Sequence, residues 1–458
     1  MIYKFKQIKS KIFTKIIGFL IIKEQYTVLI LLILLNIKEK NNGKNRRFFS
    51  DASNKITILA LDGDKYRGDL TSLSHHPKIR VLFMNQRPPG WLIKPFYSEL
   101  DIVRYINAEK NSIDAINHKR AYDFMYKFLS RFYKYVSVDC VTTVNHRYPE
   151  DYNWTKVSDN LGVPFIMLYR ECLLASDYIY NLVVSRKINI GKFHGSHIIV
   201  HNDRCKQSFI DSKYTTPDKV SVAGAVRMDN FLKLIRSNKI KTQSESKKKF
   251  ILFYFNNNNN LFGNNKKDSN GVLYEKVWSD KDKLFVDLHD TIIELAKEHP
   301  DIEFIIKPKG VMVNNKAWNF YTDVVGKSQV DINKLPNYKV DTNLNVSDGI
   351  ISSSVICALQ SSTVIESAIA GKRIILPLFH DFLNTTHLNN FYWKDNLELF
   401  DVATNKNEFK KLFKDIIDNP DITENVKNKR IRLFEKWFDS TKGDSLDKYY
   451  KIISSVVH

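Results

Sequence analysis

Residues 355–377 read VICALQSSTVIESAIAGKRIILP, and they contain a complete building block of a parallel sheet. The apolar run that ends at Leu359 predicts a buried strand, and the Gln-Ser-Ser-Thr sequence after it predicts a turn into a helix. Gly371 ends that helix, and a second apolar run follows it up to Pro377. A strand, a helix and a strand in this order are typical of α/β proteins with a parallel sheet.

The turn within this stretch is a candidate phosphate-binding site. Ser361, Ser362 and Thr363 place hydroxyl groups and free backbone N–H groups at the start of the helix, where the helix dipole favours an anion. A second interpretation needs no ligand. Thr363, followed three residues later by Glu366, also matches a capping box, in which the two side chains only stabilise the start of the helix.

The same alternation of strands and helices extends through most of the chain. In the first half we expect strands at residues 56–61, 79–84, 136–144, 163–168, 196–200 and 220–223, and helices at 116–135 and 154–161. In the second half we expect strands at residues 250–255, 302–306, 355–359 and 373–376, and helices at 284–298, 363–370, 408–418 and 425–438. Strands separated by helices indicate parallel sheets that are covered on both faces.

This order of elements predicts an α/β fold with two domains. Residues 233–249 have no apolar period, so we expect them to link an N-terminal domain at 55–232 to a C-terminal domain at 250–458 that includes the last helices. Open parallel sheets bind ligands beyond the carboxyl ends of their strands. The residues that directly follow each strand are therefore the candidates for function.

The turn segment resembles the donor-binding segment of GT-B-fold glycosyltransferases, particularly those of capsule and surface-carbohydrate biosynthesis, and of the related CDP-glycerol glycerophosphotransferases. The resemblance covers about residues 135–400. It implies two Rossmann-type domains that face each other across a cleft. It also implies that Ser361, Ser362 and Thr363 hold the diphosphate of a nucleotide-sugar donor. Glu366 would meet the sugar hydroxyls of the nucleotide.

A second segment supports this resemblance. Residues 222–229 (VAGAVRMD) are similar to the G-x-x-R-x-D segment of the same family, which closes the N-terminal half before the linker. Gly224, Arg227 and Asp229 stand at the matching positions, and the match implies that Arg227 contributes to donor binding. The alternative is that Arg227 and Asp229 form only a surface ion pair.

A third segment, residues 305–310 (IIKPKG), resembles the family's I-x-K-x-H-P sequence at a strand end. The match implies that Lys307 meets the donor phosphate, whereas the alternative is a solvated lysine at the end of a strand. The chain departs from the family pattern at Lys309, where histidine is common, and at Gly310, where proline is common.

Polar residues also follow the expected strands of the first half. A transfer that inverts the sugar needs a base near the acceptor hydroxyl, and we expect Glu171 or His146 to be that base. The planar guanidinium of Arg170 suits an anionic group on the donor or acceptor. Arg147 and Asp62 are further candidates for the acceptor cleft. The alternative for each is a solvated loop residue, a helix cap or, at Asp62, ordinary turn chemistry.

The sequence offers little for a metal site or a cofactor. The four cysteines are scattered without a CxxC pair, which speaks against a zinc site and a disulfide framework and suits a reducing compartment. His75 and His76 are adjacent, so they point in different directions in a regular element. There is no GxGxxG or GxSxG sequence, and no DxD motif that suggests a metal-dependent GT-A transferase. We therefore expect a metal-independent enzyme without a cofactor, in which Lys, Arg and helix dipoles neutralise the nucleotide-sugar substrate.

Positive charge is concentrated near the N-terminus. The formal net charge is +20, and residues 1–50 contribute +9 of it, with eleven Lys or Arg against two Glu. The apolar runs at residues 16–22 and 28–35 are interrupted by the polar residues 23–25, so neither reaches the ~18 apolar residues of a spanning helix. We expect residues 1–50 to form a helical anchor on an anionic membrane surface. The alternatives are a helix packed on the first domain and a transmembrane span.

These features together predict a cytoplasmic glycosyltransferase, peripheral at the inner face of the cell membrane. It would move a sugar from a nucleotide-sugar donor to a glycan or lipid-linked acceptor in cell-surface polysaccharide biosynthesis. The alternatives are a CDP-glycerol-type polyol-phosphate transferase and a non-catalytic scaffold of a polysaccharide-assembly complex. A non-hydrolysing UDP-sugar epimerase shares the architecture but does not need the basic, apolar N-terminus. We expect no nucleic-acid partner, because such a protein would concentrate its charge on a folded domain.

Overall fold

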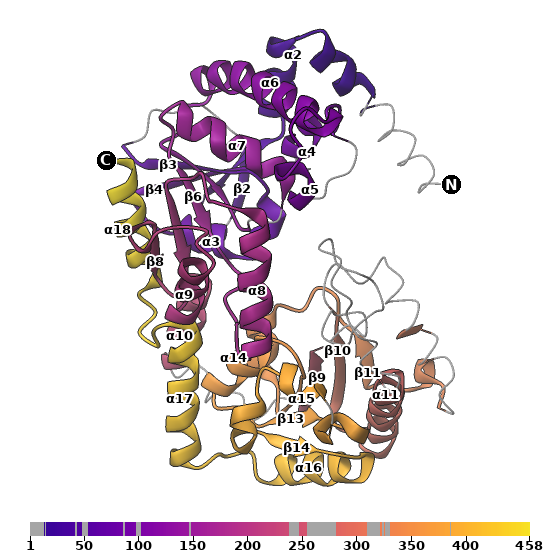
Figure 1. Cartoon of the computed structure of the whole chain (residues 1–458). Coiled ribbons are helices and arrows are strands. Elements are labelled where there is room, and N and C mark those ends of the chain that lie inside the picture. The colour runs from indigo at the N-terminus through magenta and orange to yellow at the C-terminus, as the bar shows by residue number, and fades with distance from the viewer. Residues whose placement is uncertain are drawn as a thin grey trace. The chain divides into compact units, whose positions relative to one another are not determined.

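The computed structural model describes residues 13, 15–41, 44–47, 54–85, 88–97, 102–145, 148–237, 247–253, 281–308, 321–322, 325, 330–384 and 386–458. The chain divides into two compact units (Figure 1). Unit 1 contains the described residues up to Cys172, together with Leu182–Asn230 and Phe438–His458. Unit 2 contains Leu173–Asn181 and Phe231–Trp437.

Unit 1 is built on a sheet whose described strands have the order β2-β1-β4-β3-β5-β6-β7-β8. These strands are β1 (Ile37–Asn41), β2 (Lys44–Arg47), β3 (Ile56–Ala60), β4 (Ile79–Met84), β5 (Cys140–Thr143), β6 (Phe165–Leu168), β7 (His197–Val200) and β8 (Val220–Val222). Strands β3 to β8 are all parallel. At one edge of the sheet, β1 pairs antiparallel with β4 and with β2. Every residue of β3 and β4 is buried, as expected for strands covered on both faces.

Helices cover both faces of this sheet. They are α2 (Tyr26–Leu34), α3 (Asp69–Leu73), α4 (Pro88–Ile93), α5 (Ile102–Ile106), α6 (Ile113–Tyr135), α7 (Pro149–Asn160), α9 (Asp203–Asp211) and α18 (Ser445–Val457), with short 3-10 helices η1 (Gly63–Tyr66) and η2 (Pro217–Lys219). Helices α8 (Asp177–Ile190) and α10 (Met228–Arg236) each contain residues of both units. Helix α6 begins at the N-cap Ser112, whose Oγ accepts a hydrogen bond from the backbone N of Ala115.

The N-terminal segment belongs to unit 1 and is not a separate helical region. Helical residues 15–22 and helix α2 bury one face in the core, where Ile21, Leu29 and Ile33 pack with the phenylalanines of α6. The basic residues that follow form β1 and β2. Of the three alternatives for residues 1–50, packing on the first domain is therefore the one seen for the described part. No helix in the described part of the chain has the length and apolar character needed to cross a membrane.

The C-terminal helix α18 also packs on unit 1, which differs from the expected domain boundaries of 55–232 and 250–458. Its Tyr449 lies in a hydrophobic core cluster of unit 1 together with residues of the sheet, such as Ile58 and Ile199. The Asp229 carboxylate accepts hydrogen bonds from the backbone N of Ser445 (3.3 Å) and of Leu446 (2.7 Å) at the start of the helix. At Gly224 (φ +74°), a Cβ would come within 2.7 Å of the Phe438 carbonyl, so only glycine fits there.

Unit 2 contains a second sheet, in which all described strands are parallel and have the order β11-β10-β9-β12-β13-β14. These strands are β9 (Lys249–Phe253), β10 (Glu303–Lys307), β11 (Tyr338–Val340), β12 (Val355–Cys357), β13 (Ile374–Pro377) and β14 (Asp401–Ala403). The helices are α11 (Lys281–Glu298), α13 (Val346–Ser352), α14 (Thr363–Ile369), α15 (Thr386–Asn390), α16 (Lys406–Asp418) and α17 (Glu424–Phe438), with η6 (Ile332–Lys334), η7 (His380–Asn384) and η8 (Lys394–Leu399). The expected α/β fold with two parallel-sheet, Rossmann-like units is confirmed.

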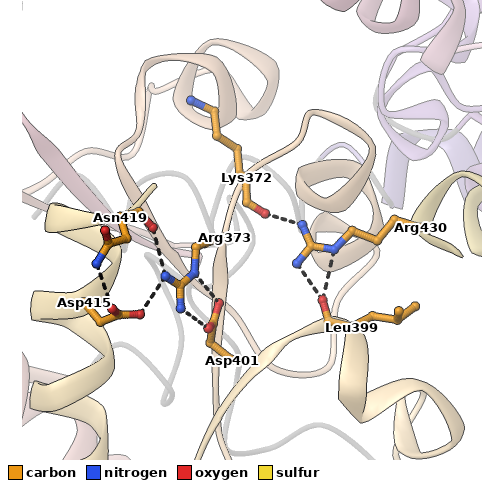
Figure 2. A network of polar contacts seen from close by, with 7 residues as sticks. All are labelled: Lys372, Arg373, Leu399, Asp401, Asp415, Asn419 and Arg430. Carbon is orange, nitrogen blue, oxygen red and sulfur yellow. Dashed lines mark hydrogen bonds and ion pairs between the residues drawn. The ribbon is translucent and has the colours of Figure 1, made fainter. Parts of the chain in front are cut away.

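Two arginines fasten α16 and α17 to the sheet of unit 2 (Figure 2). The guanidinium of Arg430, on α17, is buried and donates to the Leu399 carbonyl from Nε (3.0 Å) and Nη2 (2.6 Å). Arg373, just before β13, binds the carboxylate of Asp401 on β14 and that of Asp415 on α16. Both arginines therefore have structural roles within unit 2.

Candidate functional site

The carboxyl edge of unit 2 has a switch point between β9 and β12. The chain leaves β9 towards β10 on one side, while β12 continues to β13 on the other side, and open sheets bind ligands at such a point. The turn after β12 carries Ser361, Ser362 and Thr363. Ser361 Oγ accepts a hydrogen bond from the backbone N of Thr363 (3.2 Å) and lies 3.0 Å from Thr363 Oγ1. The expected phosphate-binding residues therefore meet in one turn at this edge.

The start of α14 has no capping box. Its N-cap is Ser362, and the Ser362 side chain makes no capping hydrogen bond. Glu366 is half-buried in the first turn, and its carboxylate accepts no hydrogen bond from a described residue. The interpretation of Thr363 and Glu366 as a reciprocal cap is therefore wrong. The Glu366 carboxylate is left for a ligand or solvent.

Lys307 lies at the same edge of the sheet, at the end of β10. One strand separates β10 from β12, so the two strand ends are ~10 Å apart. Lys307 Nζ donates to the backbone carbonyls of Pro308 (3.0 Å) and Thr342 (3.1 Å). Burial lowers the pKa of this ammonium, and the charge of Asp341 opposes the shift. The two carbonyls fix the Lys307 ammonium group at the carboxyl edge of the sheet, and because they are uncharged they do not neutralise it.

Gln360 positions the turn, and the sequence pattern did not single it out. The side chain is buried, and its Nε2 donates to the Asn390 carbonyl (2.8 Å). Its Oε1 accepts from the backbone N of Tyr392 (3.2 Å). Trp393 Nε1 also donates to the Leu359 carbonyl (3.0 Å). These partners are about 30 residues away in the sequence, so no local motif could reveal them.

Unit 1 has its own switch point, between β3 and β5, and Asp62 lies there directly after β3. Asp62 Oδ1 accepts from the backbone N of Asp64 (3.1 Å), which is the turn chemistry considered as the alternative role. Its Oδ2 also lies 3.5 Å from Lys65 Nζ. Lys65 Nζ is 3.9 Å from Glu150 Oε1 and 2.9 Å from the centre of the Tyr148 ring. Asp62 therefore belongs to a nearly buried charge cluster.

Asp151 extends this cluster into the interior. Its carboxylate accepts a hydrogen bond from Thr143 Oγ1 at 2.5 Å. It also lines a small cavity with a volume of about 20 Å³, together with Tyr148, Tyr152 and His194. Burial raises the pKa of the Asp151 carboxyl to about 7. A buried acid that titrates near neutral pH is common at functional sites. The sequence placed Asp151 behind the strand end but gave no reason to select it.

The structure brings together Arg170, a candidate for an anionic group on the donor or acceptor, and Arg227, a candidate for donor binding. Arg170 Nε lies 2.7 Å from Asp69 Oδ2, and Arg227 Nη1 lies 3.9 Å from Asp69 Oδ1. Arg170 Nη1 also donates to the Lys65 carbonyl (2.6 Å), which connects this group to the Asp62 cluster. Asp69 was not foreseen, because its partners come from distant loops.

Of the two expected bases, only Glu171 can be placed. Its side chain is exposed beside Arg170, and its carboxylate accepts no hydrogen bond from a described residue. His146 and Arg147 lie outside the described residues, so their assignments stay predictions.

His76 and the four cysteines lie among residues with structural roles. His76 stacks on Tyr450 and lies 3.8 Å from Asp447 on α18. The four cysteines are all buried free thiols. The described residues contain no group of three or more His, Cys, Asp or Glu side chains arranged to hold a metal ion.

No protein-family model and no curated protein matches this sequence. Solved structures with the same general architecture include UDP-GlcNAc 2-epimerase from Neisseria meningitidis bound to UDP-GlcNAc, at 14% identity and a TM-score of 0.45, covering 88% of this chain and 99% of that chain. The UDP-GlcNAc 2-epimerase from Methanocaldococcus jannaschii has 11% identity and a TM-score of 0.48, with 87% and 99% covered. The wall teichoic acid polymerase TagF has 13% identity and a TM-score of 0.43, with 88% and 89% covered.

Similarities this distant say nothing about what the present chain binds or catalyses. Its own two Rossmann-like units, each with polar residues at the carboxyl edge of a parallel sheet, place it among α/β proteins with two such units.

Proposed function

We propose that this protein is a glycosyltransferase that moves a sugar from a nucleotide-sugar donor to a membrane-associated glycan or lipid-linked acceptor. The observation that carries the proposal is the turn after β12. It lies at the switch point of a parallel sheet, and it presents hydroxyl groups beside Glu366, whose carboxylate accepts no hydrogen bond from a described residue.

The turn has the chemistry that a nucleoside diphosphate needs. Phosphate oxygens accept hydrogen bonds from hydroxyl groups such as those of Ser361, Ser362 and Thr363. The Glu366 carboxylate accepts from ribose hydroxyls. The Lys307 ammonium has three N–H donors, and described backbone carbonyls use two of them. The third donor, together with the positive charge, stabilises the leaving diphosphate.

Glu171 is our candidate for the base. As the acceptor hydroxyl attacks the anomeric carbon, its proton passes to the Glu171 carboxylate and the nucleoside diphosphate leaves. The support for this role is the position of Glu171 in the segment that follows β6, after Tyr169 and Arg170, at the carboxyl edge of the unit 1 sheet, together with its exposed side chain.

An apolar surface on unit 1 supports a membrane-associated acceptor. The helices that bury Ile21 and Leu29 expose large apolar side chains on their outer face. These side chains, which we call the N-terminal apolar face, are Ile16, Phe19, Ile22, Val28, Leu31 and Leu35, with exposed fractions of 43–81%. These residues lie within the strongly basic segment 1–50 of the sequence. An apolar face beside basic residues fits the interface of an anionic membrane, and an enzyme with two small, freely diffusing substrates does not need one.

A ligand screen tests the proposal. The full chain is heated with UDP, CDP, GDP, CMP and their sugar conjugates, next to the variant Glu366→Ala. A ligand that binds only the folded state stabilises it by about 2.7 kcal/mol at 100 times its Kd, so one diphosphate series should raise the melting temperature. We expect Glu366→Ala to reduce that rise.

The matched control is Glu398→Ala, which removes an exposed carboxylate in η8 of the same unit. It should respond to ligands like the unmodified chain. If no nucleotide shifts a cooperative transition, the scaffold alternative replaces the transferase. A response to CDP-glycerol without a response to nucleotide sugars supports the polyol-phosphate transferase.

A further inference from the structure

Asp69 and the two arginines beside it form an ion cluster whose hydrogen bonds are incomplete. The side chain of Asp69 is only 4% exposed, and those of Arg170 and Arg227 are 11% and 19% exposed. Arg170 Nε touches Asp69 Oδ2, but the N–H does not point along a hydrogen bond. Arg227 Nη1 and Asp69 Oδ1 are also buried, and neither atom hydrogen-bonds to a described residue.

Positive charge is in excess at this cluster. Arg67, exposed in the loop between β3 and α3, lies near enough to act on Arg170. Burial lowers the pKa of the Arg170 guanidinium, the charge of Asp69 opposes this, and the charges of Arg227 and Arg67 add to it. Even with the exposed Glu171 included, three guanidinium groups face two carboxylates. The nearby His201 adds no charge, because burial and the two buried arginines hold its pKa well below the ordinary value.

A purely structural role explains only part of this arrangement. Arg170 does fasten the loop, since Nη1 donates to the Lys65 carbonyl at 2.6 Å. Gly68 (φ +106°) lets the same loop turn beside Arg227, whose Cβ would lie 3.8 Å from a Cβ at that glycine. The 3.9 Å separation between Arg227 Nη1 and Asp69 is too long for a hydrogen bond. A buried N–H without an acceptor is costly, so a ligand oxygen is the missing partner.

We propose that Arg67, Arg170 and Arg227 bind a phosphate group of a substrate, with Asp69 holding the two buried guanidinium groups in place. This inference rests on the proposed function and assigns a phosphate group of one of its substrates to these residues of unit 1. Guanidinium groups bind phosphate through paired N–H donors, and an excess of positive charge is what a dianion requires. The phosphate belongs either to the nucleotide donor or to the acceptor.

Calorimetric titration of the full chain tests the site with three probes, which are inorganic phosphate, glycerol 3-phosphate and the nucleoside diphosphate selected by the ligand screen. The variants are Arg227→Gln and Arg67→Gln. The matched control is Arg120→Gln, which removes an exposed arginine from α6 of the same unit. We expect Arg227→Gln to raise the Kd of at least one probe about tenfold, as the loss of one charge-assisted hydrogen bond predicts. Arg120→Gln should change nothing.

The probes separate the two sources of phosphate. If Arg227→Gln weakens glycerol 3-phosphate and Glu366→Ala does not, the site binds the acceptor's phosphate. If Arg227→Gln weakens the nucleoside diphosphate and leaves glycerol 3-phosphate unchanged, the site binds the donor's phosphate. Because Arg67 is exposed, Arg67→Gln should fold normally. If Arg227→Gln fails to fold, the Kd values of Arg67→Gln for the three probes test the site instead.

The inference is overturned if both arginine variants bind every probe like Arg120→Gln, or if the unmodified chain binds none of them. Failure of the proposed function is a different result. In that case nucleotides do not bind, while inorganic phosphate still binds in a manner sensitive to Arg227.

Discussion

Asp151 is the buried acid whose ionisation should dominate the pH dependence of unit 1. Burial raises the pKa of its carboxyl to about 7, the charge of Lys65 opposes this shift, and that of Glu150 adds to it. In the unfolded chain an aspartate has a pKa of ~3.9. Between these two values the folded state holds a proton that the unfolded state has released. The free energy of unfolding should therefore fall as the pH rises from about 4 to about 7, and then level off.

The variant Asp151→Asn should lose this dependence, because its amide does not titrate but still offers an oxygen to Thr143. Between pH 4.5 and pH 8, we expect the unfolding free energy of the unmodified chain to fall by roughly 3 kcal/mol relative to the variant. Urea unfolding at both pH values measures this difference. Asp159→Asn, which removes an exposed carboxylate on the same helix α7, should follow the unmodified chain. Parallel profiles for Asp151→Asn would count against a raised pKa.

Single residues of the candidate sites were foreseen only where a local pattern marked them. Ser361 and Glu366 stand in one strand–turn–helix segment, so their proximity follows from the order of the sequence. Asp69 and Gln360 have no such pattern. Arg170 contacts a loop 105 residues before it, and only the folded sheet brings the two together. The capping box at Thr363 was misread because Ser361 and Thr363 bond to each other instead.

At the scale of elements, continuous apolar runs were foreseen well and short polar strands were not. The strand at Ile79–Met84 was predicted to the residue, because burial on both faces leaves an uninterrupted hydrophobic signal. The strands β11 and β14 were not predicted. They have three residues each, YKV and DVA, whose own preference for strand structure is weak, and they form because they pair with neighbouring strands. Strands β1 and β2 were missed for a related reason, since their polar sequences suit an exposed edge.

The N-terminal apolar face predicts that the protein binds anionic membranes. Phe19 and Ile22 are 59% and 73% exposed, so replacing both by serine should leave the core intact. We expect the double variant Phe19→Ser, Ile22→Ser to bind vesicles that contain anionic phosphatidylglycerol at least tenfold more weakly than the unmodified chain, because two apolar side chains no longer enter the interface.

Co-sedimentation with these vesicles measures the effect. Ile188→Ser, which removes an apolar side chain that is 57% exposed on α8, serves as the control and should bind normally. Equal binding by all three proteins, or binding that does not depend on anionic lipid, would remove the membrane from the proposed function.

The whole molecule is not two consecutive domains, because the chain returns to unit 1 at Phe438. Asp229 joins this return to the rest of unit 1 by capping α18 from 216 residues away. Asp229→Ala should therefore lower the unfolding free energy of unit 1 by about 1–3 kcal/mol, as the loss of a buried charged cap predicts. Asp229→Asn keeps an acceptor oxygen and should cost less.

Urea unfolding followed by tryptophan fluorescence gives the overall loss, and hydrogen exchange of the α18 amides shows whether it originates at this helix. If the α18 amides exchange no faster in Asp229→Ala, the cap is not what holds the helix on unit 1.

Because α18 packs on unit 1, unit 1 can complete its folding only after the whole chain has been synthesised. Unit 1 lacks Tyr449 and Ile453 until residues 438–458 have been synthesised, although its first strands leave the ribosome hundreds of residues earlier. At ~5–20 residues per second, the early strands wait tens of seconds for their last partner while unit 2 is made and folds. During that interval the nascent chain exposes an incomplete apolar core beside its N-terminal helices. A chaperone or a membrane surface that covers apolar side chains would stabilise the chain most at this stage.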